Sequence, residues 1–76
     1  MSIKIYTKTV CPKCMLIKST LDSAGIDYEA INIDENEDAK NFILDQGFLS
    51  VPIMEHKGQL TGEVSEMIKT ISGIAE

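Results

Sequence analysis

The feature that most limits how this chain can fold is a pair of cysteines, Cys11 and Cys14, at the junction of a predicted strand and a predicted helix. Residues 3–7 (Ile-Lys-Ile-Tyr-Thr) are rich in β-branched and aromatic side chains, which predicts a short strand. Pro12 suits the first position of a helix, because proline lacks the N–H that this position leaves unpaired. Apolar residues then recur at helical spacing after Cys14. The sequence therefore predicts that a strand leads directly to a helix that begins at the two cysteines.

The remaining elements follow from apolar periodicity and turn residues, and they predict one domain over residues 1–76 with the order βαβαββα. The first two strands are expected to be parallel with a right-handed crossover, and the last two to form an antiparallel hairpin. The predicted fold class is α/β, a four-stranded mixed sheet with helices on both faces. We expect strands over 3–7, 26–33, 51–54 and 59–61, with a turn over 55–58. We expect the first helix over 12–24 and the third over 63–74; the second begins with an acidic cap at 34–38 and ends at 46.

The Cys-Pro-Lys-Cys spacing indicates redox or metal chemistry rather than a structural staple. A disulfide over so short a span removes little entropy from the unfolded chain. A zinc site needs four ligands, commonly from two such pairs, whereas this chain has two cysteines and one histidine. That histidine, His56, is predicted to lie in an exposed turn, too far along the chain to act as a catalytic base. Thiol exchange needs only a thiolate and a nearby second thiol, so we expect a redox dithiol.

The two cysteines are expected to have different roles. Cys11 lies at a helix N-terminus, where the helix dipole and free N–H groups stabilise an anion and lower the pKa of a thiol below the ~8.5 of free cysteine. Cys14 lies about one helical turn further on, so its sulfur can reach that of Cys11. We expect Cys11 to be the exposed attacking thiolate and Cys14 to be the more buried resolving thiol.

Charge is distributed unevenly around this pair. The chain has a net charge of −5, but residues 1–21 hold four lysines and no acid, so they sum to +4, and residues 22–76 sum to −9. The cysteines therefore lie in the basic part of an acidic protein, which favours a thiolate and steers acidic partners. Lys8 and Lys13 are close to the pair in sequence, whereas Lys4 and Lys18 are expected to be ordinary solvated residues.

Several broad classes of protein do not fit this composition. The net negative charge argues against nucleic-acid binding, and no apolar run approaches the ~20 residues that span a bilayer. The N-terminal residues are too short and too alternating a stretch for a signal peptide. We therefore expect a cytoplasmic protein with no membrane partner, no nucleic-acid partner and no cofactor.

Three segments spread over nearly the whole chain resemble the glutaredoxins. Residues 5–8 (Ile-Tyr-Thr-Lys) precede the Cys-Pro-x-Cys motif, residues 50–52 (Ser-Val-Pro) accompany the third strand, and residues 61–62 (Thr-Gly) follow the fourth. The resemblance implies the thioredoxin fold, with the active site at the end of the first strand, and thiol–disulfide oxidoreductase activity. It also implies a cis Pro52 that faces the cysteines, and a Val51 backbone that pairs with a substrate backbone. From position alone, a trans Pro52 that marks the strand start is the alternative.

The resemblance carries over to a set of site residues on two separate parts of the chain. Cys11 and Cys14 are the expected catalytic residues. The residues expected to bind substrate are Lys8, Pro12, Lys13, Val51, Pro52 and Gly62.

Within the family, the chain is more similar to the NrdH-redoxins, which donate electrons to ribonucleotide reductase and are recharged by thioredoxin reductase. Residues 46–52 (Gln-Gly-Phe-Leu-Ser-Val-Pro) and the Thr-Gly…Met-Ile pattern at 61–68 carry this similarity. Lys13 stands where typical glutaredoxins have an aromatic residue. Residues 60–62 (Leu-Thr-Gly) stand where NrdH-redoxins usually have Trp-Ser-Gly. Phe48 is either a contact for a partner or a cap on the core.

Typical glutaredoxins also hold the amino end of glutathione with a Gly-Gly-x-Asp-Asp stretch. This chain has Thr-Gly-Glu-Val-Ser at 61–65, so both aspartates are absent. Glu63 comes one residue early, and a rotation of about 100° at a helix start predicts that it points elsewhere. Lys8 and Lys13 are candidates for the carboxylate end of glutathione.

The leading hypothesis is a monomeric electron carrier that reduces protein disulfides, with ribonucleotide reductase as a candidate target. Its electron donor is expected to be thioredoxin reductase or glutathione. A glutathione-dependent glutaredoxin is the alternative within the same chemistry. The alternative from another class is a module in which two chains share a metal or iron–sulfur centre through their cysteines.

Overall fold

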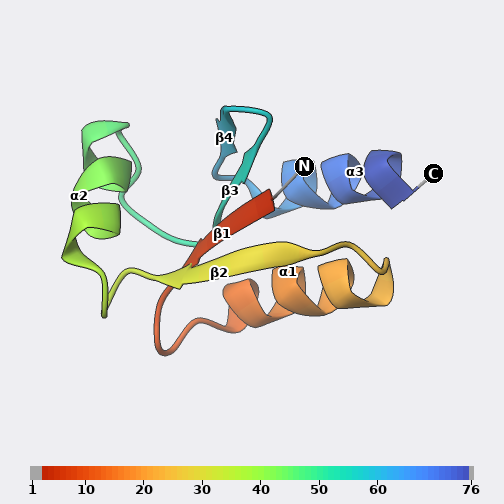
Figure 1. The fold of residues 1–76 in the computed structure, drawn as a ribbon, viewed down its shortest axis with the longest axis horizontal. Helices are drawn as coiled ribbons and strands as arrows, with labels where there is room; N and C mark the ends of the chain where they lie inside the picture. Colours follow the sequence, from red (N-terminus) through yellow and green to blue (C-terminus); the bar gives the residue numbers. More distant parts are fainter. Residues whose placement is uncertain (1–2, 76) are drawn as a thin grey trace.

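The computed structural model describes residues 3–75 and has the predicted order of strands and helices (Figure 1). The predicted α/β class, with a four-stranded mixed sheet, is confirmed. The strands are β1 (Ile3–Thr7), β2 (Tyr28–Asn32), β3 (Ile53–His56) and β4 (Gln59–Thr61), and the helices are α1 (Pro12–Ser23), α2 (Glu37–Asp45) and α3 (Val64–Ala75).

β1 is an inner strand of the sheet, whose order is β2-β1-β3-β4. It runs parallel to β2 and antiparallel to β3, and β3 runs antiparallel to β4. The β1–β2 ladder extends to the pair Thr7 and Asn32, and the β1–β3 ladder to the pair Tyr6 and Ile53. The segment that follows Thr7 therefore leaves a strand that is hydrogen-bonded on both sides.

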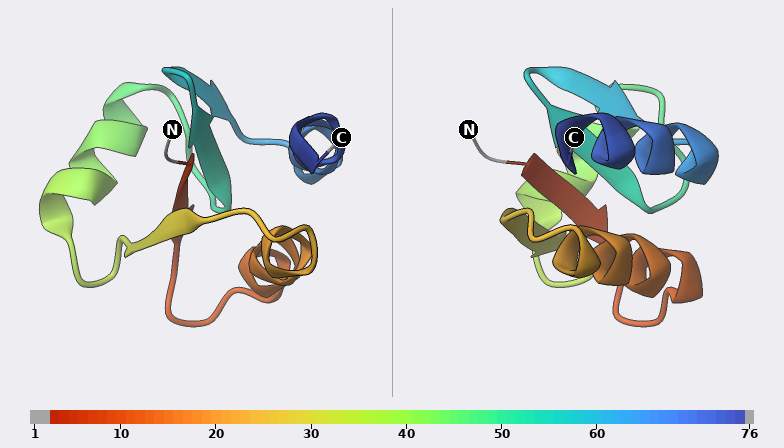
Figure 2. Two further views of the ribbon diagram at one scale, coloured as in Figure 1. Left: turned by 45° about the vertical axis from the view of Figure 1, so that its right-hand side comes forward. Right: turned by 90° about the vertical axis from the view of Figure 1, so that its right-hand side faces the viewer.

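The helices cover both faces of the sheet. Figure 2 shows α1 and α3 side by side on one face and α2 on the other. Successive side chains of a strand point to opposite faces of the sheet, so β1 contributes residues to two core layers, one under α1 and α3 and one under α2. The buried residues of the α1/α3 layer are Ile3, Ile5, Ile17, Leu21, Met54, Met67 and Ile71, and those of the α2 layer are Tyr6, Ile33, Ile43 and Ile53.

The helices begin and end where their capping residues predict. Cys11 is the N-cap of α1, followed directly by Pro12 at the first helical position. The side chain of Asn36 caps α2 by accepting the N–H of Ala39 at 3.0 Å, and acidic residues occupy the first turn, which suits the helix dipole. Gly47 follows α2 with a φ of 90°, a conformation that glycine adopts without a steric penalty.

The hairpin differs from the prediction. We expected a strand over 51–54 and a turn over 55–58, but β3 runs from Ile53 to His56. The turn consists of Lys57 and Gly58 alone, which have φ values of 53° and 78°. Such a two-residue turn matches the twist of the flanking strands, so the strands continue up to it. His56 is therefore a half-buried strand residue paired with Gln59, not an exposed turn residue.

Other boundaries differ from the prediction by one or two residues. β2 covers 28–32 instead of 26–33, because its pairing with β1 limits its length, and α3 begins at residue 64 instead of 63. No helix within residues 3–75 has the length and apolar character needed to cross a bilayer.

Candidate active site

Cys11 and Cys14 form a disulfide at the N-terminal end of α1, with their Cα atoms 5.2 Å apart. The Cys11 sulfur accepts the backbone N–H of Cys14 at 3.1 Å, so it acts as the capping group of the helix. Cys14 is only 1% exposed, whereas Cys11 is half-buried. The more accessible sulfur is therefore the one that lies where the helix dipole and a backbone N–H stabilise negative charge.

Two adjoining grooves share the residues Lys13, Ser50 and Val51, and the first of them is also lined by Cys11. Every residue predicted to bind substrate lines at least one of them, and the buried Cys14 lines neither. The first groove is lined by Lys8, Val10, Cys11, Pro12, Lys13, Leu49, Ser50 and Val51, and the second by Lys13, Leu16, Ser50, Val51, Pro52, Gly62, Glu63, Val64 and Ser65.

The Val51–Pro52 peptide bond is cis, as the family resemblance implied. Pro52 is buried and lines the second groove, whereas Val51 is half-buried and lines both grooves. The β1–β3 ladder reaches only Ile53, and no backbone hydrogen bond involving Val51 occurs within residues 3–75. The Val51 backbone is therefore available for pairing with another chain.

Two exposed apolar side chains beside Cys11 were not singled out from the sequence. Val10 is 84% exposed and Leu49 is 91% exposed, and both line the first groove. Because these two side chains contribute little to the core, they are available for apolar contact with a bound partner. The available signal was an apolar residue within each of the two loops that carry the site motifs.

A hydrogen-bonded network that the sequence analysis also missed connects the segment before Cys11 to the end of β2. The backbone N–H of Thr9 donates to Asp34 Oδ2 at 3.0 Å, and Asn32 Nδ2 donates to Thr9 Oγ1 at 3.2 Å. The backbone N–H of Asp34 in turn donates to Asn32 Oδ1 at 2.8 Å. Asn and Asp favour such local contacts in turns, which was the signal available in Asn-Ile-Asp at 32–34.

The pKa of the Asp34 carboxyl lies below its ordinary value. The main cause is the hydrogen bond from the N–H of Thr9; burial acts in the opposite direction, and the charges of Lys8 and Lys40 lower the pKa further. A lowered folded-state pKa means that the ionised carboxylate stabilises the fold at neutral pH. That contribution is lost as the pH falls through the folded-state pKa.

Phe48 packs against the core layer under α2 and also against Gly62. A Cβ atom on Gly62 would lie 2.9 Å from Phe48 Cε1 and 3.0 Å from Cδ1, which is too close. Of the two hypotheses for Phe48, the contact favours the cap on the core. Gly62 thus lines the second groove on one side and leaves room for the Phe48 ring on the other.

Alanine in place of Gly62 should destabilise the protein by about 1–3 kcal/mol, because the added methyl group must displace the Phe48 ring. Gly73→Ala is the matched control, since a Cβ at that helical position meets nothing within 4 Å and alanine is the better helix former. Urea denaturation of both variants measures the difference. Equal stability of Gly62→Ala and the wild-type protein would contradict the packing argument.

The segment that follows Gly62 borders the second groove. Glu63, Val64 and Ser65 are among the residues that line it. Glu63 directly precedes α3, which begins at Val64. Val64 is half-buried against the α1/α3 layer, and Ser65 is exposed on the groove. Glu63 is therefore the acidic residue among those that line this groove, and both aspartates of typical glutaredoxins are absent.

His56 lies at the end of β3 that is remote from Pro52. Within residues 3–75, no three side chains among His, Cys, Asp and Glu come together as a metal site. The chemistry that the described residues bring together is that of a dithiol beside a substrate groove.

Comparisons with known proteins agree with this geometry. The family model for glutaredoxin matches residues 3–61. The glutaredoxin-like protein NrdH of Salmonella typhimurium is 37% identical over 54 residues, which are 71% of this chain and 67% of that protein. The corresponding protein of Escherichia coli is 35% identical over 54 residues, with the same coverage of 71% and 67%. The solved structure of the Escherichia coli NrdH-redoxin, described as having a thioredoxin-like activity profile, superposes with a TM-score of 0.82 at 27% identity, covering 91% of this chain and 93% of that one.

Proposed function

This chain belongs to the glutaredoxin family, and from that premise we propose that it reduces protein disulfides with Cys11 as the attacking thiolate and Cys14 as the resolving thiol. The general activity, thiol–disulfide exchange of the NrdH-redoxin kind, follows from the family and the paired cysteines. The observation that supports the division of roles is the Cys11 sulfur at the helix N-terminus, which accepts the Cys14 N–H beside an open groove.

The proposed reaction proceeds in two exchanges. The Cys11 thiolate attacks one sulfur of the target disulfide, which breaks that bond, forms a mixed disulfide and releases the other target sulfur as a thiolate. Cys14, after losing its proton, attacks Cys11 Sγ and releases the second target thiolate. The target gains two electrons and, from solvent, two protons, and the carrier is left with the Cys11–Cys14 disulfide.

The groove supplies a place for the target segment. The free backbone of Val51 offers a short antiparallel bridge to an extended substrate, and Val10 and Leu49 offer apolar contact on the Cys11 side. Lys8 and Lys13 line the same groove and suit a target with acidic residues near its disulfide. These features favour a protein segment as the substrate.

The partners are proposed from the same family membership. We propose ribonucleotide reductase as a target, thioredoxin reductase as the electron donor, and a monomer as the working form. We also propose a cytoplasmic location, because thiols stay reduced in that compartment. A glutathione-dependent glutaredoxin is the second candidate. It is favoured by Glu63, an acidic residue among those that line the second groove, where the ammonium end of glutathione would bind.

The division of roles predicts the order in which the reduced cysteines react. Cys11 should alkylate first, with a pKa below the ~8.5 of free cysteine, because it is the more exposed thiol and caps α1. The measurement is limited alkylation of the reduced protein over a range of pH, with the labelled peptide identified by mass spectrometry. Labelling of Cys14 before Cys11 would show that the assignment is wrong.

A further inference from the structure

The segment that carries Cys11 has few packing contacts of its own. Lys8, Thr9 and Val10 are all exposed, so apolar burial does not fix the path of the chain between β1 and α1. Loops without buried contacts are held by hydrogen bonds or they move. The contacts that fix this segment are the two hydrogen bonds of Thr9 to Asp34 and Asn32.

We propose that Asp34 is a positioning residue for Cys11. Its carboxylate accepts the N–H of Thr9, two residues before the nucleophile, and so holds the segment in the path that places the Cys11 sulfur at the start of α1. The inference rests on the proposed function, because it assigns Asp34 a role only through the thiolate of Cys11. Asp34 does not touch the reacting sulfurs.

The carboxylate is itself fixed from the sheet. Asn32 pairs with Thr7 at the end of the β1–β2 ladder, and the N–H of Ile33 donates to the carbonyl of Thr7 at 2.8 Å. The N–H of Asp34 then donates to Asn32 Oδ1 at 2.8 Å. Asp34 therefore links the end of β2, which is part of the sheet, to a segment that lies outside it.

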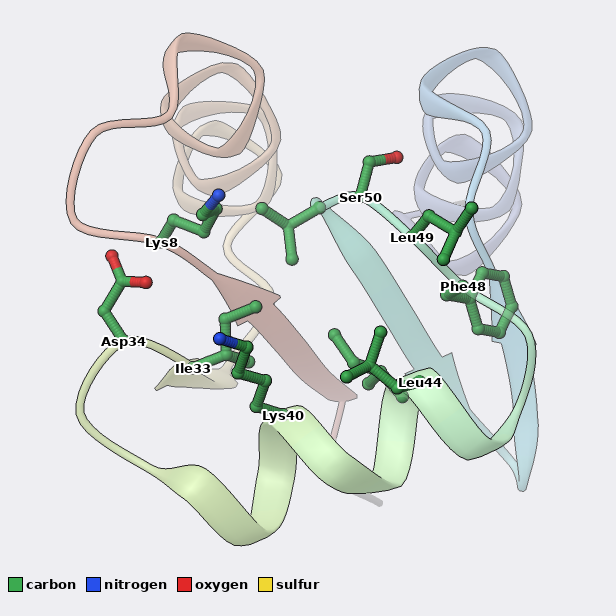
Figure 3. A pocket seen from close by; sticks show the side chains of 10 residues that line it. Lys8, Ile33, Asp34, Lys40, Leu44, Phe48, Leu49 and Ser50 are labelled. Atoms are coloured by element: carbon green, nitrogen blue, oxygen red, sulfur yellow. The ribbon is translucent and has the colours of Figure 1, made fainter.

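The charge of Asp34 and the hydrogen bond that it accepts are expected to have opposite effects on the Cys11 thiolate. Figure 3 shows Asp34 at the edge of a pocket that is also lined by Lys8, from the segment after β1, and by Lys40, from α2. Glu37, also on α2, lines a pocket with Asp34 and Lys40. A negative charge near Cys11 disfavours a thiolate, whereas holding Cys11 at the helix N-terminus favours it. Removing only the charge and removing the hydrogen bond should therefore have opposite effects on the reactivity of Cys11.

Two substitutions separate these effects. Asp34→Asn keeps an oxygen that accepts the Thr9 N–H and removes the charge, while Asp34→Ala removes both. At pH 7 we expect Cys11 of the reduced Asp34→Ala protein to alkylate about two- to tenfold more slowly than Cys11 of Asp34→Asn, the range expected for losing one hydrogen bond. The midpoint of the alkylation–pH profile should be higher in the alanine variant by about 0.3–1 unit. Asp34→Asn should match or exceed the wild-type rate.

A third variant and a stability measurement complete the experiment. Thr9→Ala keeps the backbone N–H that donates to Asp34 and loses the hydroxyl that accepts from Asn32, so its alkylation profile should shift less than that of Asp34→Ala. Identical profiles of Asp34→Ala and Asp34→Asn would overturn the inference. So would a lower melting temperature of Asp34→Ala with no shift in its profile, because that result indicates a purely structural role. The order of alkylation in the wild-type protein tests the proposed function separately, since this inference depends on the ratio between the two variants.

Discussion

Serine in place of Cys11 should reduce disulfide exchange to the uncatalysed background, whereas serine in place of Cys14 should leave the first exchange intact and trap the target. The difference arises because only Cys11 combines access to the groove with the stabilising N–H and dipole of α1. Without Cys14 there is no second thiolate within the protein to attack the mixed disulfide. The loss in the Cys11 variant should be complete, since a serine hydroxyl does not exchange with disulfides.

The measurement has two parts. Steady-state reduction of a protein disulfide gives the turnover of each variant, and non-reducing electrophoresis with mass spectrometry detects the covalent complex of Cys14→Ser. Ser19→Ala is a control on the same helix, because its side chain is exposed and lines neither groove. If Cys14→Ser proved inert and Cys11→Ser accumulated the complex, the two roles would have to be exchanged.

Thioredoxin reductase should recharge the oxidised protein faster than glutathione does, by about ten- to hundredfold. Glutathione is a small anionic peptide, and a site for it must hold both its carboxylate and its ammonium ends. Without an aspartate for the ammonium end, the site loses one charge-assisted hydrogen bond of about 1.5–3 kcal/mol. This loss corresponds to an interaction with glutathione that is about ten- to hundredfold weaker. Ser65 occupies one of the positions where typical glutaredoxins have an aspartate, and it is exposed on the groove. NADPH oxidation, coupled once to thioredoxin reductase and once to glutathione with its reductase, compares the two donors.

Substitutions in the groove show whether the missing acid is the cause. Ser65→Asp should raise the glutathione-dependent rate, and Ser65→Asn is the matched neutral control. Residue 64 is a poor place for this test, because Val64 packs against the core and an aspartate there would destabilise α3. Glu63→Gln should lower whatever glutathione activity the wild-type protein has, since Glu63 lines the same groove. A faster wild-type rate with glutathione than with thioredoxin reductase would return the protein to the ordinary glutaredoxins.

The first strand and first helix could be predicted from the sequence because their signals are local. The β-branched run at 3–7, Pro12 at the first helical position, and the burial of Cys14, Ile17 and Leu21 all follow from short-range spacing. The eight proposed site residues, too, lie together as expected, since the order of elements brings both motif segments to one end of the sheet. The cis Val51–Pro52 bond came from the resemblance and not from the residues alone.

The remaining features depend on contacts between distant parts of the chain. The polar pair Glu55-His56 is typical of a turn in sequence, yet it continues β3 because Lys57 and Gly58 suffice to close the hairpin. The Thr9–Asp34 hydrogen bond joins residues 25 apart in sequence, and neither residue indicates its partner by spacing. Each of these follows from tertiary structure rather than from local propensity.

The two-residue turn between β3 and β4 has a practical consequence. β3 leaves the disulfide end of the sheet at Ile53, which pairs with Tyr6, and ends at His56 beyond the pair of Glu55 and Lys4. Lys57 and Gly58 therefore stand at the opposite pole of the molecule from Cys11, as Figure 1 shows for the turn joining β3 to β4. A peptide tag inserted there adds little loop-closure entropy. Immobilised through that tag, the protein would present its whole reactive end to solution, which makes the turn the natural anchor for a redox sensor built on this scaffold.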